Sequence, residues 1–521
     1  MPRLQVILLV SFMLLTLLPR PGIGEINQNL SAEELTVLQA AEITVQLGRQ
    51  YQDSIWPGYD LDRRPLFVYI PDTWAILFNA PPSATGFTTP PESWPNLQTD
   101  LLYHAGKYDE LVGQLAFDMP IDSLQVAAVG FIDQGLYDFL AYLLHENFHQ
   151  YQHAHFGEIP WEREERYPIE DADNSSLAGL EVILLQQALE SLGHADDALA
   201  FDKIRQFVGV RLYRWQNIPS NVRMYELGLE INEGTAKYVE MKALSLVPRV
   251  RYESHLNYTD QLASVEPTSL DMRLSLIDNL QRIFADGAIA PENMPRNRVY
   301  PVGATEGVLL DYLGIDWKPI AQLAGPQFTF AGLLGDALGV DSTDIDSLVA
   351  VARNQNQYAS IRKLSEKSIA EYRTGFDSAL AIFESQSGFR VTAKLSGRNL
   401  RRSSYSHAKR WLADNGTRQL RGHNQVYELR SIPGDDLTIQ LTETGMMELN
   451  DWSTRDKTVI FYSPEITSCE IDGKPMRLTG SVKRQFDSLH LKGPVFEITA
   501  NRPGMISADN GEILIDWLDP S

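Results

Sequence analysis

The segment from Asp133 to Gly157, DQGLYDFLAYLLHENFHQYQHAHFG, constrains the fold more than any other part of the chain. Its apolar residues recur at the spacing of one helix face, which predicts a single long helix with a buried stripe. The stripe consists of Leu136, Phe139, Leu140, Leu143, Leu144, Phe148 and Tyr151. Asp133 is the expected N-cap, and Gly157 followed by Pro160 is the expected stop. Four of the ten histidines of the chain fall between His145 and His155 on this helix.

The middle of this segment reads His145-Glu146-Asn147-Phe148-His149. Residues four apart are neighbours on a helix surface, so His145 and His149 present two imidazoles on one face. Both can reach one zinc ion at about 2.0–2.1 Å. Glu146 lies beside the first histidine, in the H-E-x-x-H arrangement in which the glutamate acts as general base. The alternative interpretation is a surface helix that carries histidines and holds no metal.

The composition sets broad limits on the rest of the chain. Its 521 residues predict two or three domains, and 44% hydrophobic residues supply enough material for packed cores. The formal charge is −23 and basic residues do not cluster, so a nucleic-acid partner is not expected. Cys469 is the only cysteine, so no internal disulfide can form and stability must come from packing.

Residues 1–24 have the pattern of a secretory signal peptide. Arg3 precedes an apolar run from Leu4 to Leu18, and small residues precede Glu25. The run is shorter than the roughly 20 residues of a membrane span, although an uncleaved anchor is an alternative. We therefore expect a secreted, periplasmic or cell-envelope protein with no integral membrane domain after signal removal. An exported chain of this size without disulfides favours a bacterial envelope.

Periodicity predicts a small sheet ahead of the histidine helix. An amphipathic helix is expected over Ala32–Gln52. Four short apolar runs then predict strands: Leu66–Ile70, Trp74–Phe78, Leu111–Phe117 and Leu124–Phe131. Met119-Pro120 is the expected turn between the last two strands.

After the histidine helix the pattern stays helical as far as Gly388. The predicted helices are Ser176–Leu192, Ala195–Trp215, Asn221–Leu246, Ser269–Ala285, Gly303–Leu313 and Ser360–Gln386. From Phe389 to Trp517, short β-branched runs alternate with turn residues, which predicts a sandwich or a small barrel. We therefore expect an α+β fold class, with a mainly helical domain at residues 25–388 and a β-rich C-terminal module at 389–521. Binding a surface, a glycan or a partner, or bracing the first domain, are open roles for this module.

A catalytic zinc site needs a third protein ligand, and two segments offer one. His155 lies ten residues after His145, where metzincins place a third histidine, but Gln152 stands where those proteins have a glycine. The other segment runs from Glu230 to Glu240 and reads EINEGTAKYVE.

In this second segment the chain resembles the gluzincin class of zinc metallopeptidases. In that class a glutamate from a second helix, often in an Asn-Glu-Gly-x-Ala-x-Tyr setting, joins the H-E-x-x-H helix. The matching residues are Asn232, Glu233, Gly234, Ala236 and Tyr238. The resemblance covers these two segments and implies that Glu233 is the third ligand of a Zn2+ ion. It also implies a zincin-like metallopeptidase domain.

Gly234 supports a functional interpretation of this segment. A glycine inside a helix costs about 1 kcal/mol relative to alanine, so we expect the metal-bearing helix to approach closely there. The alternative is that Glu226, Glu230, Glu233 and Glu240 form one solvated acidic stripe. Glu230, one turn earlier, is the second choice of ligand.

The chain departs from the aminopeptidase-like gluzincins in two ways. The separation of His149 from Glu233 is longer, and no Gly-x-Met-Glu-Asn segment is present to hold a free amino terminus. An endopeptidase is therefore expected. The candidates for the donor that stabilises the oxyanion are Tyr300, His153 and Tyr238. The candidates for orienting the ligands are Asn147, Gln150 and Glu240.

The expected function is that of an exported zinc-dependent peptidase acting on peptides or proteins, with His145, His149 and Glu233 as ligands and Glu146 as general base. Two other classes are open. One is an exported binding protein with a structural or vestigial metal site. The other is a zinc hydrolase of a non-peptide amide or ester. The sequence does not indicate an oligomeric state.

Overall fold

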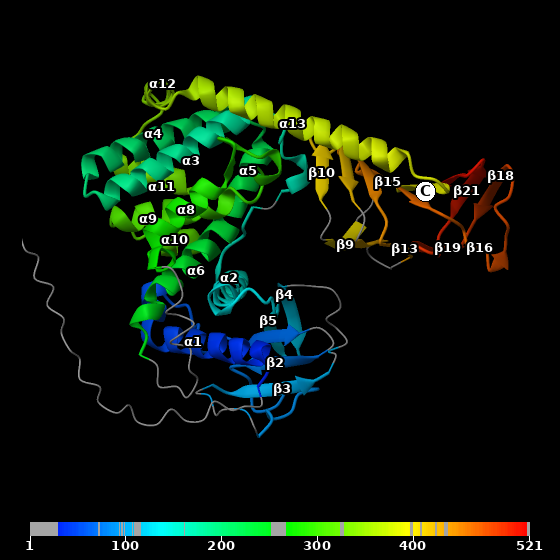
Figure 1. Ribbon diagram of the computed structural model, residues 1–521, viewed down its shortest axis with the longest axis horizontal. Helices are drawn as coiled ribbons and strands as arrows, with labels where there is room; N and C mark the ends of the chain where they lie inside the picture. Colours follow the sequence, from blue (N-terminus) through cyan, green and yellow to red (C-terminus); the bar gives the residue numbers. More distant parts are fainter. Residues whose placement is uncertain are drawn as a thin grey trace, which may run out of the picture.

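The computed structural model describes residues 30–517 (Figure 1). The described range has gaps at 71–72, 93, 95–96, 98, 107, 109–115, 161, 252–266, 324–327, 396–399, 407–408, 423–424 and 432–435. The predicted signal peptide at 1–24 and most of the predicted strand Leu111–Phe117 lie outside the described residues. Within them the chain is α+β, with a β-rich C-terminal part. No helix in this part of the chain has both the length and the apolarity to cross a membrane.

The N-terminal part is a helix on a five-stranded sheet. Helix α1 (Ala32–Ile55) starts at a capping box formed by Ser31 and Glu34. The strand order is β3-β2-β1-β5-β4. The bounds are β1 Leu66–Ile70, β2 Trp74–Phe78, β3 Leu101–Ala105, β4 Ala116–Ile121 and β5 Leu124–Gly130. The predicted bounds of β1 and β2 are confirmed.

Both faces of this sheet are buried, because alternate residues of a strand point to opposite faces. Leu66 and Val68 belong to the main core together with the apolar residues of α1. Phe67 and Tyr69 enter a smaller core on the other face.

The predicted turn at Met119-Pro120 is wrong. Both residues belong to β4, and Pro120 pairs with Gln125 of β5. Proline is tolerated there because β4 is an edge strand whose outward N–H groups need no partner. The chain turns instead at Asp122, whose φ of 52° lies in the left-handed region that Asp adopts more readily than most residues.

Helix α2 (Leu136–His155) follows β5 directly and carries the predicted apolar stripe, all of which is buried. It begins two residues later than expected: Gly135, with φ 86°, is the N-cap, and no side chain caps the helix. Asp133 is therefore not the N-cap. The helix lies between the N-terminal sheet and the remaining helices, in contact with α1, β5 and α6 (Figure 1).

The remaining helices pack beyond α2 around the same core. Their bounds are α3 Ala172–Gly193, α4 Asp197–Gln216, α5 Ser220–Leu229, α6 Thr235–Leu246, α8 Met272–Arg282, α9 Val299–Tyr312, α10 Lys318–Leu323, α11 Phe330–Leu338, α12 Ile345–Gln355 and α13 Tyr358–Glu384. A π-helical turn, η2 (Glu230–Gly234), joins α5 to α6 without a break. The predicted helix Asn221–Leu246 is thus one continuous element with a local widening in its middle. The hairpin of β6 Phe284–Ala285 and β7 Ala288–Ile289 follows α8.

The C-terminal part is a sandwich of two sheets. One has the order β10-β11-β14-β15-β8-β22-β21-β18, and the other β17-β16-β19-β20-β13-β12-β9. The bounds are β8 Phe389–Leu395, β9 Leu400–Ser406, β10 Arg410–Ala413, β11 Arg418–Arg421, β12 Gln425–Ser431, β13 Leu437–Thr442, β14 Met446–Asp451, β15 Asp456–Ser463, β16 Ser468–Ile471, β17 Lys474–Pro475, β18 Val482–Phe486, β19 Leu489–Gly493, β20 Phe496–Ala500, β21 Gly504–Asp509 and β22 Glu512–Asp516. Phe461 of the first sheet and Ile498 of the second lie in one shared core.

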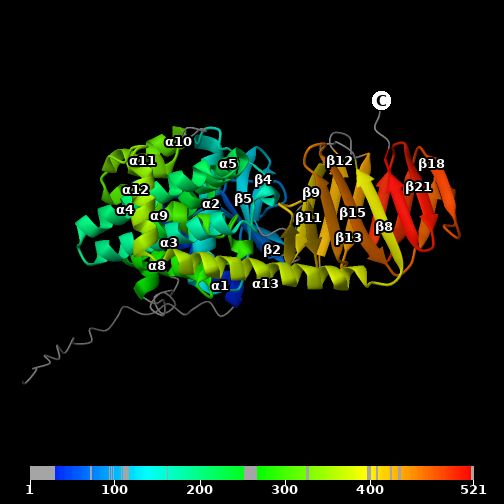
Figure 2. The same cartoon turned by 90° about the horizontal axis from the view of Figure 1, so that it is seen from above.

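Helix α13 connects the two parts. It runs from the helical part along one end of the sandwich in both views (Figures 1 and 2). Phe376 and Phe383 pack against Leu420, Met447 and Ile460 of the first sheet. The sandwich therefore packs against α13 itself and is not connected to the helical part by a linker alone.

Behind the η2 turn lies a fully buried cluster of charges from α3, α4, α5, η2 and α9. Its members are Glu181, Arg211, Arg214, Glu226, Glu230, Arg298 and Glu306. Arg214 donates to Glu226 at 2.6 Å, and Arg211 donates to Glu230. Burial opposes ionisation of Glu226, but Arg214 and Arg298 hold its pKa well below the usual range.

Glu306 is the exception in this cluster. Burial and the nearby carboxylate of Glu230 hold its pKa well above the usual range, and neither of its side-chain oxygens has a hydrogen-bond partner among the described residues. Both features favour the neutral form of its carboxyl group. The cluster then balances three arginines against three carboxylates, so no uncompensated charge remains in the core.

This difference predicts opposite outcomes for two matched substitutions. Glu306→Gln should change the free energy of unfolding by less than about 1 kcal/mol at pH 7, because a neutral group replaces a neutral group. Glu226→Gln should cost about 3–5 kcal/mol, because it leaves buried arginines without a partner. Denaturant unfolding of both variants measures the difference. Equal losses in the two variants would mean that Glu306 is ionised.

Candidate metal centre

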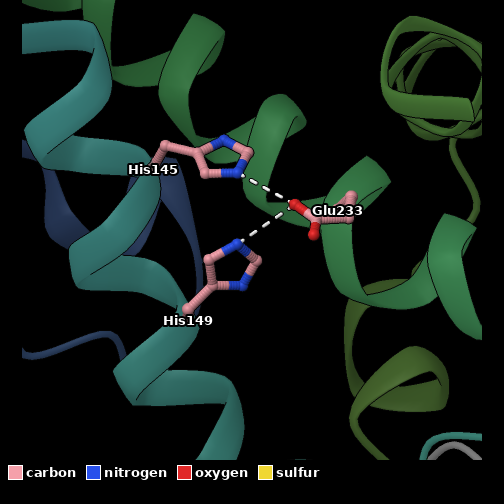
Figure 3. Close-up of side chains that lie close together, drawn as sticks. All are labelled: His145, His149 and Glu233. Carbon is pink, nitrogen blue, oxygen red and sulfur yellow. Dashed lines mark hydrogen bonds and ion pairs between the residues drawn. The ribbon is translucent and has the colours of Figure 1, made fainter. Parts of the chain in front are cut away.

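Three side chains from two elements converge between α2 and η2 (Figure 3). His145 and His149 of α2 each point their Nε2 atom at one oxygen, Oε2 of Glu233, and both distances are 3.2 Å. His145 is 7% exposed and Glu233 4% exposed, so the meeting point is shielded from bulk water. Among the described residues this is the one group of three or more His, Cys, Asp and Glu side chains placed to hold a metal ion.

The local helix geometry brings Glu233 to this point. It lies in the π-helical turn, where one extra residue per turn bulges the helix. Such turns are rare and occur frequently at functional sites. Gly234 is required in this turn, but the reason differs from the expected one. A Cβ on Gly234 would lie 2.9 Å from Cα of Gly303, so the close neighbour is α9 and not the histidine helix α2.

The second ring nitrogen of each histidine has an acceptor. Nδ1 of His145 lies 3.2 Å from Oε2 of Glu240, and Nδ1 of His149 lies 2.7 Å from Oε1 of Gln152. An acceptor at Nδ1 fixes the ring orientation and leaves Nε2 to bind a metal. The Gln152 amide also donates to the carbonyl of Asn232 at 2.7 Å and to Oγ1 of Thr235 at 2.6 Å. Gln152 thereby ties the histidine helix to the turn that carries Glu233.

Arg296 and Tyr300 complete the surroundings of Glu233. Nη2 of Arg296 donates to Oε1 of Glu233 at 2.7 Å, which turns the other oxygen toward the two histidines. Nε of Arg296 donates to the Tyr300 hydroxyl at 3.0 Å. The Tyr300 ring stacks on His145 with centroids 5.8 Å apart. Tyr300 therefore lies at the site, as expected for a donor to the reacting group.

The charges at the site stabilise one another. Burial lowers the pKa of His145, but its hydrogen bonds to Glu233 and Glu240 outweigh that effect and raise the pKa to about 9. Burial disfavours the charged form of Glu233, but His145, His149 and Arg296 hold its pKa well below the usual range. Burial and Glu233 raise the pKa of Tyr300, so its hydroxyl stays protonated and can donate. Without a metal, the site thus holds a protonated His145 beside an ionised Glu233.

The donor set suits a divalent metal. Two atoms bound to one zinc at about 2.0–2.1 Å in a tetrahedron are roughly 3.3 Å apart. The two histidine-to-carboxylate distances of 3.2 Å match this edge, and the three donor atoms lie within 4.8 Å of one another. Two imidazoles and one carboxylate also form a catalytic zinc set that leaves a position open. The set alone does not discriminate zinc from other first-row divalent metals.

The structure places the other sequence-based candidates away from this group. His155 is exposed, stacks on Tyr151 and has its Nδ1 atom 3.0 Å from that residue's carbonyl oxygen. Glu230 belongs to the buried charge cluster through Arg211. The Tyr238 hydroxyl donates to Asp311 at 2.5 Å, inside an aromatic cluster with Trp56 and Trp317.

The remaining sequence-based candidates differ in whether they contact the two histidines or Glu233. His153 is exposed on α2. Asn147 accepts a hydrogen bond from Tyr59, and Gln150 donates to the carbonyl of Gln125, so both tie α2 to its N-terminal neighbours. Of the three residues considered for orienting the ligands, Glu240 alone contacts one of them. The alternative of a solvated acidic stripe is wrong, because Glu226, Glu230, Glu233 and Glu240 are all buried.

Glu146 follows His145 on α2 and is half-buried. Its negative charge contributes to the raised pKa of His145. Among the described residues no donor engages it.

Sequence reasoning missed Gln152 and Arg296. Gln152 lies three residues after His149, a spacing at which helix side chains meet, so this signal was present. Arg296 lies four residues before Tyr300, but nothing local links it to Glu233, 63 residues earlier in the chain.

Comparisons of the chain with protein-family models, with curated proteins and with solved structures found no match.

The raised pKa of His145 predicts a pH-dependent metal affinity. A metal must displace the proton, so zinc affinity should rise about tenfold per pH unit from pH 7 and level off near pH 9. Titration calorimetry at pH 7.5 in buffers of different ionisation enthalpy should record release of about one proton per zinc. In Glu240→Gln, which lacks one of the carboxylates that raise this pKa, the release should be smaller. An affinity that stays constant between pH 7 and pH 9 would contradict this charge assignment.

The assignment of Glu233 as a ligand, and of His155 as a residue outside the site, predicts different zinc affinities for substitutions at these two positions. Glu233→Ala should weaken zinc binding at least about 100-fold, because even the outer partners of ligands contribute about 10- to 100-fold. His155→Ala should leave the affinity unchanged. Zinc per chain after dialysis against a competing chelator measures both. A greater loss in His155→Ala would reverse the assignment.

Proposed function

We propose that this protein is a zinc-dependent peptidase, and that it acts as an endopeptidase. The single observation that carries the proposal is the convergence of His145, His149 and Glu233, with Glu146 next to the first histidine. The resemblance of the two segments to gluzincins supports the same function and a zincin-like character for the helical part. The signal-like residues 1–24 support export from the cytoplasm.

The roles of the residues follow from their chemistry. His145, His149 and Glu233 would hold the zinc ion, which when bound lowers the pKa of water and polarises a carbonyl group. Glu146 accepts a proton from the attacking water while the water oxygen forms a bond to the peptide carbonyl carbon. Glu146 then delivers this proton to the leaving nitrogen as the C–N bond breaks. The water thus divides between the new carboxylate and the new amine.

Two further groups support this reaction. The Tyr300 hydroxyl is protonated at neutral pH and lies at the site, so it can donate to the oxyanion that forms during attack. Arg296 positions both Tyr300 and Glu233. The absence of a Gly-x-Met-Glu-Asn segment supports an endopeptidase over an enzyme that holds a free amino terminus.

Substitution of the general base tests the proposal. Residues 25–521 loaded with zinc should hydrolyse an unstructured protein, and a chelator should abolish the activity. Glu146→Gln should bind one zinc per chain like the unaltered protein and lose about 10²–10⁴-fold in kcat, because it cannot take up the proton. Peptide release and zinc content are measured on the same samples.

Two outcomes would overturn the proposal. If the unaltered protein and Glu146→Gln are equally inactive while both are folded and zinc-loaded, the site is structural. If small esters or amides are hydrolysed and proteins are not, the substrate is not a polypeptide.

A further inference from the structure

A second feature of the fold lies next to the metal centre, at the junction with the sandwich. A cavity of about 860 Å³ opens between the segment 162–166 of the helical part and strands β10, β11, β14 and β15. Arg296 lines this cavity and also donates to Glu233. The cavity therefore shares Arg296 with the surroundings of Glu233.

A chain of charges connects the two sides of this cavity. Arg410 of β10 pairs with Glu164, which lies 3.9 Å from Nη1 of Arg296. Arg296 in turn pairs with Glu233 at 2.7 Å. The sandwich is thus linked to Glu233 through three successive ion pairs, and it forms one wall of the cavity.

The cavity is held in shape on both sides. The β10–β11 turn packs tightly on the segment 164–170: a Cβ on Gly416 would overlap the carbonyl oxygen of Glu165. The backbone N–H of Asp414 donates to Glu170 at 3.1 Å, and Glu170 also accepts from Arg373 of α13 at 2.8 Å. These contacts hold both walls of the cavity in fixed positions, as a binding site requires.

The charge of the lining contrasts with that of the chain. Six basic and five acidic side chains line the cavity, so it carries a net positive charge in a protein whose formal charge is −23. Several of these charges are already paired. Arg166 and Arg455 are exposed, and in the described part of the chain no carboxylate lies within ion-pair distance of either. Arg163 lies over the Trp452 ring, 5.8 Å from its centroid. Of the acidic side chains in the lining, Glu162 has no ion-pair partner among the described residues.

We infer that this cavity binds an acidic segment of the polypeptide substrate, beside the bond that is cleaved. The inference rests on the proposed function and extends it to a substrate class. Guanidinium groups pair with carboxylates through two parallel hydrogen bonds, and Arg166 and Arg455 approach the cavity from opposite walls. Trp452 also lines the cavity and adds an aromatic side chain to it. The sandwich is then a part of the substrate site.

Two peptides of the same length test this assignment, one with two glutamates beside the cleavable bond and the other with two glutamines. The unaltered protein should cleave the acidic peptide with the higher kcat/KM. In the double variant Arg166→Gln and Arg455→Gln, the ratio of kcat/KM between the two peptides should fall about tenfold, because two exposed charge pairs are lost. Arg484→Gln, an exposed arginine on β18 at the far edge of the same sheet, should leave the ratio unchanged.

A binding measurement separates this inference from the proposed function. Fluorescence anisotropy of rhodamine-labelled acidic peptide with Glu146→Gln should show binding that weakens about tenfold when Arg166 and Arg455 are also replaced by glutamine. If no peptide is hydrolysed but this binding is observed, the proposed function fails and the cavity assignment holds. Equal binding of the two peptides, or no effect of the arginine substitutions, overturns the cavity assignment. So does stronger binding of an anionic oligosaccharide that displaces the acidic peptide.

Discussion

The carboxylate of Glu233 is the point on which the arrangement of the helical part depends. It accepts from Arg296 with one oxygen and faces both histidines with the other. A buried carboxylate is costly unless cations surround it, so α2, η2 and the start of α9 must meet at this place. The buried charge cluster behind η2 fixes the same turn from the other side, through Arg211 and Glu230. The convergence of the two histidines on Glu233 is therefore a consequence of how the charges of the core are paired.

Much of this could be predicted from the sequence because local periodicity determines it. The apolar stripe of α2, the bounds of β1 and β2 and the change from helix to strand after α13 follow from spacing within a few residues. The same holds for His145 and His149, which share a face because they are four apart. The choice of Glu233 needed the resemblance to gluzincins, since spacing alone left Glu230 and His155 open.

The rest depends on contacts between distant segments. The need for Gly234 arises from Gly303, on a helix 69 positions later, and the sequence gives no sign of that approach. Arg296 finds Glu233 for the same reason only after folding. Met119-Pro120 resembled a turn because proline often marks one, and its place on an edge strand depends on the order of the whole sheet. Glu226 and Glu230 looked like solvent-exposed acids because their arginine partners lie on α4 and α9.

Helix α13 has a consequence for truncation of the chain between the helical part and the sandwich. Its 27 residues form a rod of roughly 40 Å, with one half bedded in the helical part and the other in the sandwich. The Leu412 N–H donates to the Tyr372 hydroxyl at 2.7 Å, and Trp411 fills the space beside Gly375. A shortened gene that ended with this helix would leave Phe376 and Phe383 bare to water. The helical part and the sandwich therefore share a buried contact surface along α13.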